Sequence, residues 1–117
     1  MNDFEIGVDI EKINRFDSKD YSKKNNFLNK IFSKKELDYC FSKKNTSSHL
    51  AGKFAAKEAI IKAISAINKE NLTYDQIEIL NNSDGIPEVF ILKNELKIKI
   101  SISHSEDNAI AMAIVFH

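Results

Sequence analysis

The chain has 117 residues, of which 43% are hydrophobic and 29% are charged, a composition typical of one soluble globular domain rather than a disordered or fibrous protein. No apolar run approaches the roughly 20 residues of a membrane-spanning helix, and the N-terminus lacks the pattern of a secretory signal. The single cysteine, Cys40, cannot form an internal disulfide. We therefore expect a cytoplasmic protein with no membrane partner and a single domain over residues 1–117.

The formal net charge is zero, with 17 basic and 17 acidic residues, yet the charges are unevenly distributed along the chain. The stretch from Lys12 to Lys62 holds 13 basic and 5 acidic residues, whereas the rest holds 4 basic and 12 acidic residues. This segregation indicates either a basic surface for an anionic partner or an ordinary solvated lysine-rich surface. Arg15 is the only arginine, so lysine point charges must make most contacts with anions.

Apolar residues alternate with polar or small ones at the beginning of the chain, at Phe4, Ile6, Val8 and Ile10. This period of two predicts a strand with one face in the core. Asp9 then lies on the opposite face, away from the core.

Short helices are expected next. Residues 14–32 are polar with scattered apolar positions, which predicts one or two short helices. Ser33 and Glu36 have the spacing of a capping box, which predicts a helix running to about Lys43. Cys40 falls on this helix among apolar residues, which favours a role in core packing.

The longest helical pattern runs to about Ile67, and residues 46–48 offer alternative N-caps for it. Its apolar positions cover so much of the surface that we expect a largely buried helix. Four strands follow, at residues 76–80, 88–92, 96–103 and 109–116. One strand, then helices, then a run of strands predicts an α+β fold with the long helix packed on an antiparallel sheet.

Glu58 is a carboxylate on this largely buried helix, so it needs a partner. Lys62, four residues later, offers an ordinary structural ion pair. The alternative is a metal site with Asp9 as the second carboxylate, because Mg²⁺ usually takes one or two protein carboxylates together with waters and phosphate oxygens. Spacing alone favours the structural pair and leaves both interpretations open.

Other side chains are candidates for binding a polyphosphate. Lysines cluster on and just before the long helix, at Lys43, Lys44, Lys53, Lys57 and Lys62. Ser103, His104 and Ser105 stand where a predicted strand ends, and they form either a capped turn with an exposed histidine or part of a site. The adjacency of Ser103 and His104 is only a weak sign of nucleophilic catalysis, because members of a catalytic triad meet through the fold.

Four motifs together carry a family resemblance across nearly the whole chain. They are Gly7-Val8-Asp9-Ile10, Ala51-Gly52-Lys53-Phe54-Ala55-Ala56-Lys57-Glu58-Ala59 with Lys62-Ala63, Asp84-Gly85-Ile86-Pro87, and Ile102-Ser103-His104-Ser105. In these residues the chain resembles holo-acyl-carrier-protein synthase, the short bacterial type of 4′-phosphopantetheinyl transferase. The long-helix motif is highly specific, whereas the other motifs add weight mainly by their positions.

The resemblance implies that the 4′-phosphopantetheine arm of coenzyme A passes to a serine hydroxyl of apo acyl carrier protein, releasing adenosine 3′,5′-bisphosphate and supporting fatty acid biosynthesis. It implies that Asp9 and Glu58 hold Mg²⁺, and that Lys62 completes the catalytic set by neutralising charge on the transferring phosphoryl group. Deprotonation of the serine by Glu58 is a further implied role. These roles agree with phosphoryl transfer, which depends on positioning and electrostatic stabilisation.

The same resemblance implies contacts with coenzyme A for a wider set of residues: Lys44, Lys53, Lys57, Lys62, Gly85, Pro87, Ser103 and His104. It implies a homotrimer with active sites between neighbouring subunits. It also implies a basic early segment that meets the acidic carrier protein, at Arg15, Lys19, Lys23 and Lys24. Lys53 stands where relatives typically have arginine, which keeps the charge but loses the bidentate geometry.

Two rival functions remain. A nucleic-acid-binding module explains the basic stretch but gives no role to Asp9 or Glu58, and the stretch lacks interleaved aromatic and arginine readers. A degenerate relative without turnover is disfavoured because both expected metal ligands are present. The magnesium-dependent transferase, with no nucleic-acid partner, is therefore the favoured interpretation.

Overall fold

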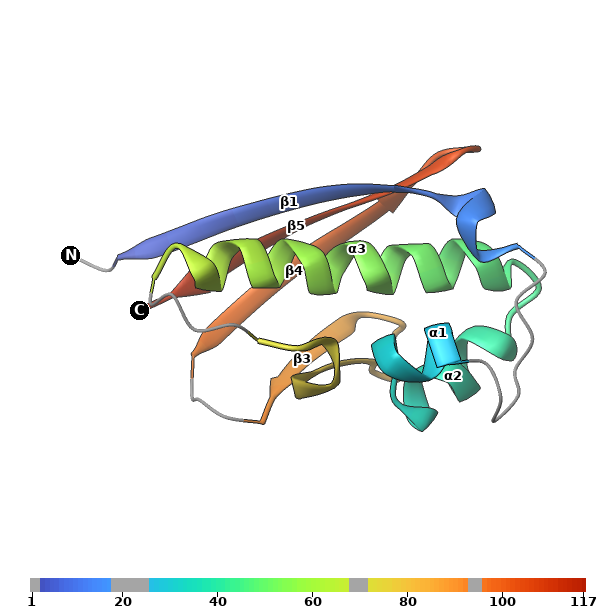
Figure 1. Ribbon diagram of the computed structural model, residues 1–117, viewed down its shortest axis with the longest axis horizontal. Coiled ribbons are helices and arrows are strands. Elements are labelled where there is room, and N and C mark those ends of the chain that lie inside the picture. The colour runs from blue at the N-terminus through green and yellow to red at the C-terminus, as the bar shows by residue number, and fades with distance from the viewer. Residues whose placement is uncertain (1–2, 18–25, 68–71, 93–95) are drawn as a thin grey trace.

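A long helix, α3 (Thr46–Ser65), runs through the molecule with a sheet on one side and the shorter helices and a hairpin on the other (Figure 1). The computed structural model describes residues 3–17, 26–67, 72–92 and 96–117. The remaining elements, in chain order, are β1 (Phe4–Lys12), η1 (Ile13–Phe16), α1 (Asn26–Ile31), α2 (Lys34–Phe41), η2 (Tyr74–Gln76), β2 (Ile77–Asn81), β3 (Pro87–Ile91), β4 (Lys97–His104) and β5 (Asn108–Phe116).

The strands form two antiparallel sheets within the described residues. The larger has the order β1-β5-β4, and β2 pairs with β3 in a separate hairpin. In the register of β1 with β5, Gly7 lies opposite Ala113 and Asp9 lies opposite Ala111. The predicted α+β class is confirmed, and the predicted bounds of the last four strands agree with the structure to within one residue.

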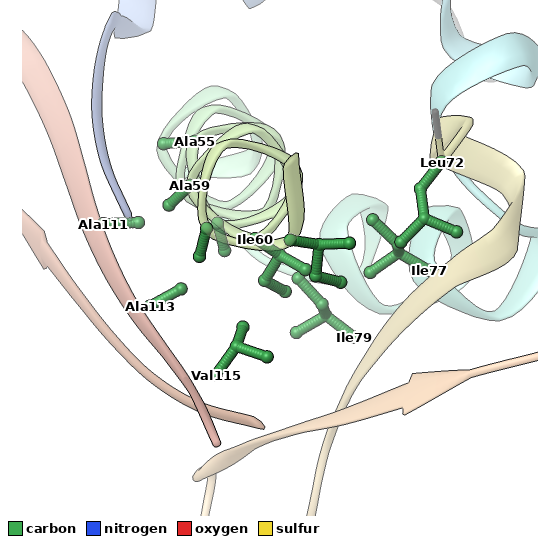
Figure 2. Packing of buried hydrophobic residues seen from close by; sticks show 12 residues of the cluster. Ala55, Ala59, Ile60, Leu72, Ile77, Ile79, Ala111, Ala113 and Val115 are labelled. Carbon is green, nitrogen blue, oxygen red and sulfur yellow. The ribbon is translucent and has the colours of Figure 1, made fainter. Parts of the chain in front are cut away.

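Small residues let α3 lie close against the larger sheet. Ala59 of the helix packs in one apolar cluster with Ala111 and Ala113 of β5 (Figure 2). A Cβ atom on Gly7 would lie 1.9 Å from the backbone oxygen of Ala59, so no larger residue fits there without a shift of the backbone. Because Asp9 is two residues further along β1 and on the same face, this close packing also brings Asp9 next to α3.

The opposite side of α3 carries larger side chains. Ile60 packs with Ile77 and Ile79 of the β2 strand (Figure 2). The first half of the helix joins a second apolar cluster that includes η1, α1 and α2, where Cys40 is fully buried. The expectations of a largely buried helix and of a packing role for Cys40 are both confirmed.

The starts of the helices confirm one prediction and correct another. The capping box before α2 is present, because the backbone N–H of Glu36 donates to Ser33 Oγ at 3.2 Å and that of Ser33 donates to Glu36 Oε1 at 2.8 Å. The N-cap of α3 is Asn45, not a residue within 46–48, and its side chain makes no capping bond. The Thr46 hydroxyl instead donates to the carbonyl of Lys43, which closes the preceding turn.

The prediction for the two faces of β1 is wrong. Its apolar side chains are 54 to 62% exposed, at Phe4, Ile6, Val8 and Ile10. Gly7 is buried, and the Asp9 side chain is only 12% exposed. The alternation correctly predicts a strand, but the need for a small residue under α3 decides which face turns inward. Asp9 therefore lies on the helix side of the sheet, and an apolar face is left open on the other side.

Candidate active site

Asp9 and Lys62 meet where β1 passes the C-terminal half of α3. The Lys62 ammonium donates to Asp9 Oδ1 at 3.2 Å and to the backbone carbonyl of Val8 at 3.0 Å. The Lys62 side chain is 55% exposed, so this ion pair is open to solvent and to a ligand. Of the two interpretations that the sequence left open for Glu58, the ion pair with Lys62 is not formed, because Lys62 reaches across to Asp9 of β1 instead.

Glu58 stands one helical turn before Lys62, on the same side of α3. It is half-buried, and its Oε1 accepts a hydrogen bond from the phenol of Tyr74 in η2. Burial and the Glu58 carboxylate raise the pKa of Tyr74 to about 12, and Glu11 of β1 acts on it in the same direction. The phenol therefore keeps its proton and donates it in a hydrogen bond to Glu58.

Asp9 has a carboxylate oxygen that no hydrogen-bond donor in the described residues reaches while Glu11 is ionised. Its Oδ2 is buried and has no hydrogen-bond partner, which is costly for a carboxylate unless a ligand completes it. Burial and the neighbouring Asp9 raise the pKa of Glu11 to about 7, although Arg15 at 3.1 Å opposes this shift. Asp9 and Glu11 therefore crowd one another on the helix side of β1.

This donor set fits a hard divalent cation. Within the described ranges no group of three or more His, Cys, Asp or Glu side chains is preassembled around a point. The unsatisfied oxygen of Asp9 and the carboxylate of Glu58 are instead suited to Mg²⁺, which usually takes only one or two protein carboxylates and completes its shell with water and phosphate oxygens.

Lys57 is buried inside the protein, and its ammonium is bonded to other groups of the chain rather than exposed where coenzyme A was expected to contact it. Its side chain has no exposed surface, and its ammonium donates to Glu36 Oε1 at 2.7 Å, to the carbonyl of Ile31 at 2.6 Å and to that of Tyr74 at 3.2 Å. Burial lowers the pKa of Lys57, while Glu36 opposes that shift. Lys57 therefore joins α1, α2 and η2 to the long helix.

Lys53 is also buried, yet it borders open space. It donates to the carbonyl of Ile79 and to Asn81 Oδ1, both at 2.7 Å, and burial lowers its pKa. With two predicted lysines buried, less positive charge is available to bind nucleic acid than the sequence indicates.

A cavity of about 380 Å³ brings together four of the predicted coenzyme residues, Lys53, Gly85, Pro87 and His104. The Nε2–H of His104 donates to the carbonyl of Ser48 at 2.8 Å. Gly85 has a φ of +80°, which is why glycine occupies this turn. Lys44 and Ser103 are exposed and do not line this cavity.

Sequence reasoning missed four polar residues of the cavity, Tyr39, His49, Asn81 and Ser101. The ammonium groups of Lys43 and Lys53 each lie 4.9 Å from the centre of the Tyr39 ring. The His49 ring makes an edge contact with Tyr39, and burial together with His104 lowers the pKa of His49. The cavity is thus aromatic and basic, which suits a phosphorylated nucleotide.

Of the residues predicted to meet the carrier protein, only Arg15 is described. Its guanidinium lies over the rings of Phe27 and Phe54, at 5.4 and 5.1 Å from their centres, and bonds Glu11. Lys19, Lys23 and Lys24 lie outside the described residues.

The family model of the 4′-phosphopantetheinyl transferase superfamily matches residues 5–115. The chain belongs to this superfamily. A holo-[acyl-carrier-protein] synthase of Thermodesulfovibrio yellowstonii is 46% identical over 94% of this chain and 96% of its own length. That of Chlorobaculum parvum is 42% identical over 95% of this chain and 97% of its own. The family resemblance seen in the sequence is confirmed.

Solved structures agree with this membership. The holo-(acyl-carrier-protein) synthase of Bacillus anthracis in complex with CoA (3′,5′-ADP) matches with a TM-score of 0.79 and 31% identity, covering 96% of this chain and 95% of that one. The Helicobacter pylori synthase in complex with coenzyme A matches with a TM-score of 0.78 and 34% identity, covering 94% of this chain and 98% of that one. Among the described residues, no helix has the length and apolarity to span a bilayer.

Proposed function

We propose that this chain transfers the 4′-phosphopantetheine group of coenzyme A to a serine of apo acyl carrier protein with Mg²⁺ as cofactor. The observation that carries the proposal is the buried Oδ2 of Asp9, held beside the exposed Lys62, which itself lies one turn of α3 after Glu58. The names of its relatives and their coenzyme complexes support the same reaction. We place the enzyme in the cytoplasm, where its product would serve fatty acid biosynthesis.

The proposed reaction is a phosphoryl transfer without redox chemistry. The serine oxygen bonds to the phosphorus that carries the pantetheine arm, the bond to the leaving adenosine 3′,5′-bisphosphate breaks, and the serine proton passes to Glu58 directly or through a water. Bound Mg²⁺ supplies charge neutralisation on the pyrophosphate. Asp9 and Glu58 hold the cation, and Lys62 exchanges its bond to Asp9 for contact with phosphoryl oxygens.

We also infer that the active form is a homotrimer. The open apolar face of β1 continues onto β5, where Ile110 and Met112 are more than 40% exposed, and such a continuous apolar surface is typical of an interface. Lys53 in the nucleotide cavity is nine residues from Lys62, about 13 Å along the helix axis. In an assembly where the cavity of one subunit lies next to Asp9 and Glu58 of a neighbouring subunit, one coenzyme molecule could contact both.

Light scattering tests the assembly. The unsubstituted chain is expected to have three times the subunit mass, and Val8→Glu should dissociate it by placing a charge on the apolar face. Leu92→Glu, on a still more exposed apolar residue that follows β3 rather than lying on β1, is the control and should leave the mass unchanged. A monomeric unsubstituted chain would contradict the trimer.

Intact-mass spectrometry tests the reaction. Apo acyl carrier protein incubated with this chain, coenzyme A and Mg²⁺ should gain the mass of one phosphopantetheine group, and chelation of the metal should prevent the gain. Lys97→Met, which removes an exposed lysine of β4 outside the site, is the control and should behave like the unsubstituted chain. An unmodified carrier under these conditions would contradict the proposed function.

A further inference from the structure

Tyr74 is attached at both ends to consecutive residues of α3. Its phenol donates to Oε1 of Glu58, and its backbone carbonyl accepts a hydrogen bond from the Lys57 ammonium at 3.2 Å. Lys57 is itself fixed by the buried carboxylate of Glu36. The turn that carries Tyr74 is therefore held against the same stretch of helix that presents Glu58.

The orientation of the phenol is set by packing that does not depend on Glu58. The Tyr74 ring lies 5.5 Å from the ring of the buried Phe54, centre to centre, at an interplanar angle of 47°. The turn itself is closed by Thr73 and Gln76, since the backbone N–H of Thr73 donates to Gln76 Oε1 at 3.0 Å and that of Gln76 to the carbonyl of Thr73 at 3.1 Å. A fixed donor therefore meets a carboxylate whose terminal torsion is otherwise soft.

We propose that Tyr74 is a positioning residue, whose hydroxyl engages one oxygen of Glu58 and so directs the carboxylate toward a cation shared with Asp9. This inference rests on the proposed function, because it concerns how Glu58 is presented to that cation. Groups that hydrogen-bond to metal-ligating side chains commonly set metal affinity in this manner. Nothing in the sequence motifs indicates this role, because Tyr74 is 16 positions from Glu58.

Tyr74→Phe isolates the hydroxyl, because it keeps the ring that packs on Phe54. We expect Mn²⁺ binding, followed by electron paramagnetic resonance with coenzyme A present and carrier protein absent, to weaken about tenfold. We expect kcat to fall while KM for coenzyme A stays near its original value, because Tyr74 does not line the nucleotide cavity. The thermal midpoint is measured alongside to show that the variant is folded.

Thr73→Val is the matched control, because it also removes a hydroxyl from this turn. The Thr73 hydroxyl bonds Asp75 rather than Glu58, so the Mn²⁺ affinity should remain that of the unsubstituted chain. A double-mutant cycle gives the second comparison. If Tyr74 acts through Glu58, then Tyr74→Phe has no further effect on Mn²⁺ binding once Glu58→Gln is present.

The outcomes separate this inference from the function it rests on. An unsubstituted chain that binds Mn²⁺ and modifies the carrier, with a folded Tyr74→Phe variant of equal Mn²⁺ affinity, overturns the role of Tyr74 alone. Equal loss in Tyr74→Phe and Thr73→Val also overturns it, since the effect then belongs to the turn. An unsubstituted chain that fails in both assays overturns the proposed function and this inference with it.

Discussion

Helix α3 makes two lysine–carboxylate pairs that look alike in the sequence and differ in almost every physical respect. Lys57 pairs with Glu36 at 2.7 Å, and both side chains are fully buried. Lys62 pairs with Asp9 at 3.2 Å, with the lysine half exposed. The first pair lies among α1, α2 and η2, whereas the second lies at the open edge of β1.

The use of the carboxylate oxygens separates the two pairs further. Glu36 accepts from Lys57 and from the backbone N–H groups of Ser33 and Ile79, so both oxygens are satisfied. Asp9 has one oxygen with no partner in the described residues. A satisfied, buried pair holds elements together, whereas an open pair with an unsatisfied oxygen is available for a ligand. Burial, not spacing, distinguishes the structural lysine from the one we assign to chemistry.

Removing one member of the buried pair should have the largest effect on stability. Lys57→Met leaves the Glu36 charge in the interior without its counter-charge, and we expect the free energy of unfolding to fall by about 3–5 kcal/mol. Urea unfolding followed by circular dichroism measures the change. Lys34→Met, in an exposed pair with Asp38, is the control and should cost less than about 1 kcal/mol. Equal losses of unfolding free energy in the two variants would contradict the structural role of the buried pair.

The open pair should show the reverse pattern. Lys62→Met should lower the free energy of unfolding by less than Lys57→Met does, because the Lys62 ammonium is half exposed and screened by solvent even though Asp9 is mostly buried. Its rate of carrier modification should fall about 100-fold, because charge on the transferring phosphoryl group is no longer neutralised. Initial rates by mass spectrometry and urea unfolding of the same preparation test this. Full activity in the Lys62→Met variant would show that Lys62 has no role in the reaction.

The smallest expected effect is a pH dependence of stability caused by Glu11, the neighbour of Asp9 on β1. In the metal-free chain Glu11 keeps its proton up to a pKa of about 7, whereas the ordinary value is 4.5. The folded state therefore binds more protons than the unfolded state between these values, and this contribution makes stability fall as pH rises from about 4.5 to about 7. Glu11→Gln should remove that slope in unfolding measurements across the range. An unchanged slope would show that Glu11 titrates alike in both states.

The sequence predicted the elements well because their signals are local. The capping box of Ser33 and Glu36 fixes where α2 begins, and alternation at Ile98, Ile100 and Ile102 identifies β4. The roles of Lys57 and of the β1 faces could not be predicted in this way. Both depend on which distant segments cover a residue, and the partner of Lys57 is 21 positions away on another helix.

The site shows the same division between local and distant information. Motif resemblance brought Asp9 and Glu58 forward as candidates, and the structure places Asp9 against Lys62 across 53 positions of sequence. Tyr74 and His49 carry no motif signal, because the contact of Tyr74 with Glu58 and the place of His49 in the cavity beside Lys53 exist only in the folded chain.

The most direct test of the shared cation is a Mn²⁺ titration by electron paramagnetic resonance, with coenzyme A present and with coenzyme A alone as the blank. The unsubstituted chain should bind one ion per subunit. Asp9→Asn and Glu58→Gln should each weaken that binding more than about tenfold while the circular dichroism spectrum is unchanged. If both folded variants retain the original affinity, the two carboxylates do not hold the ion.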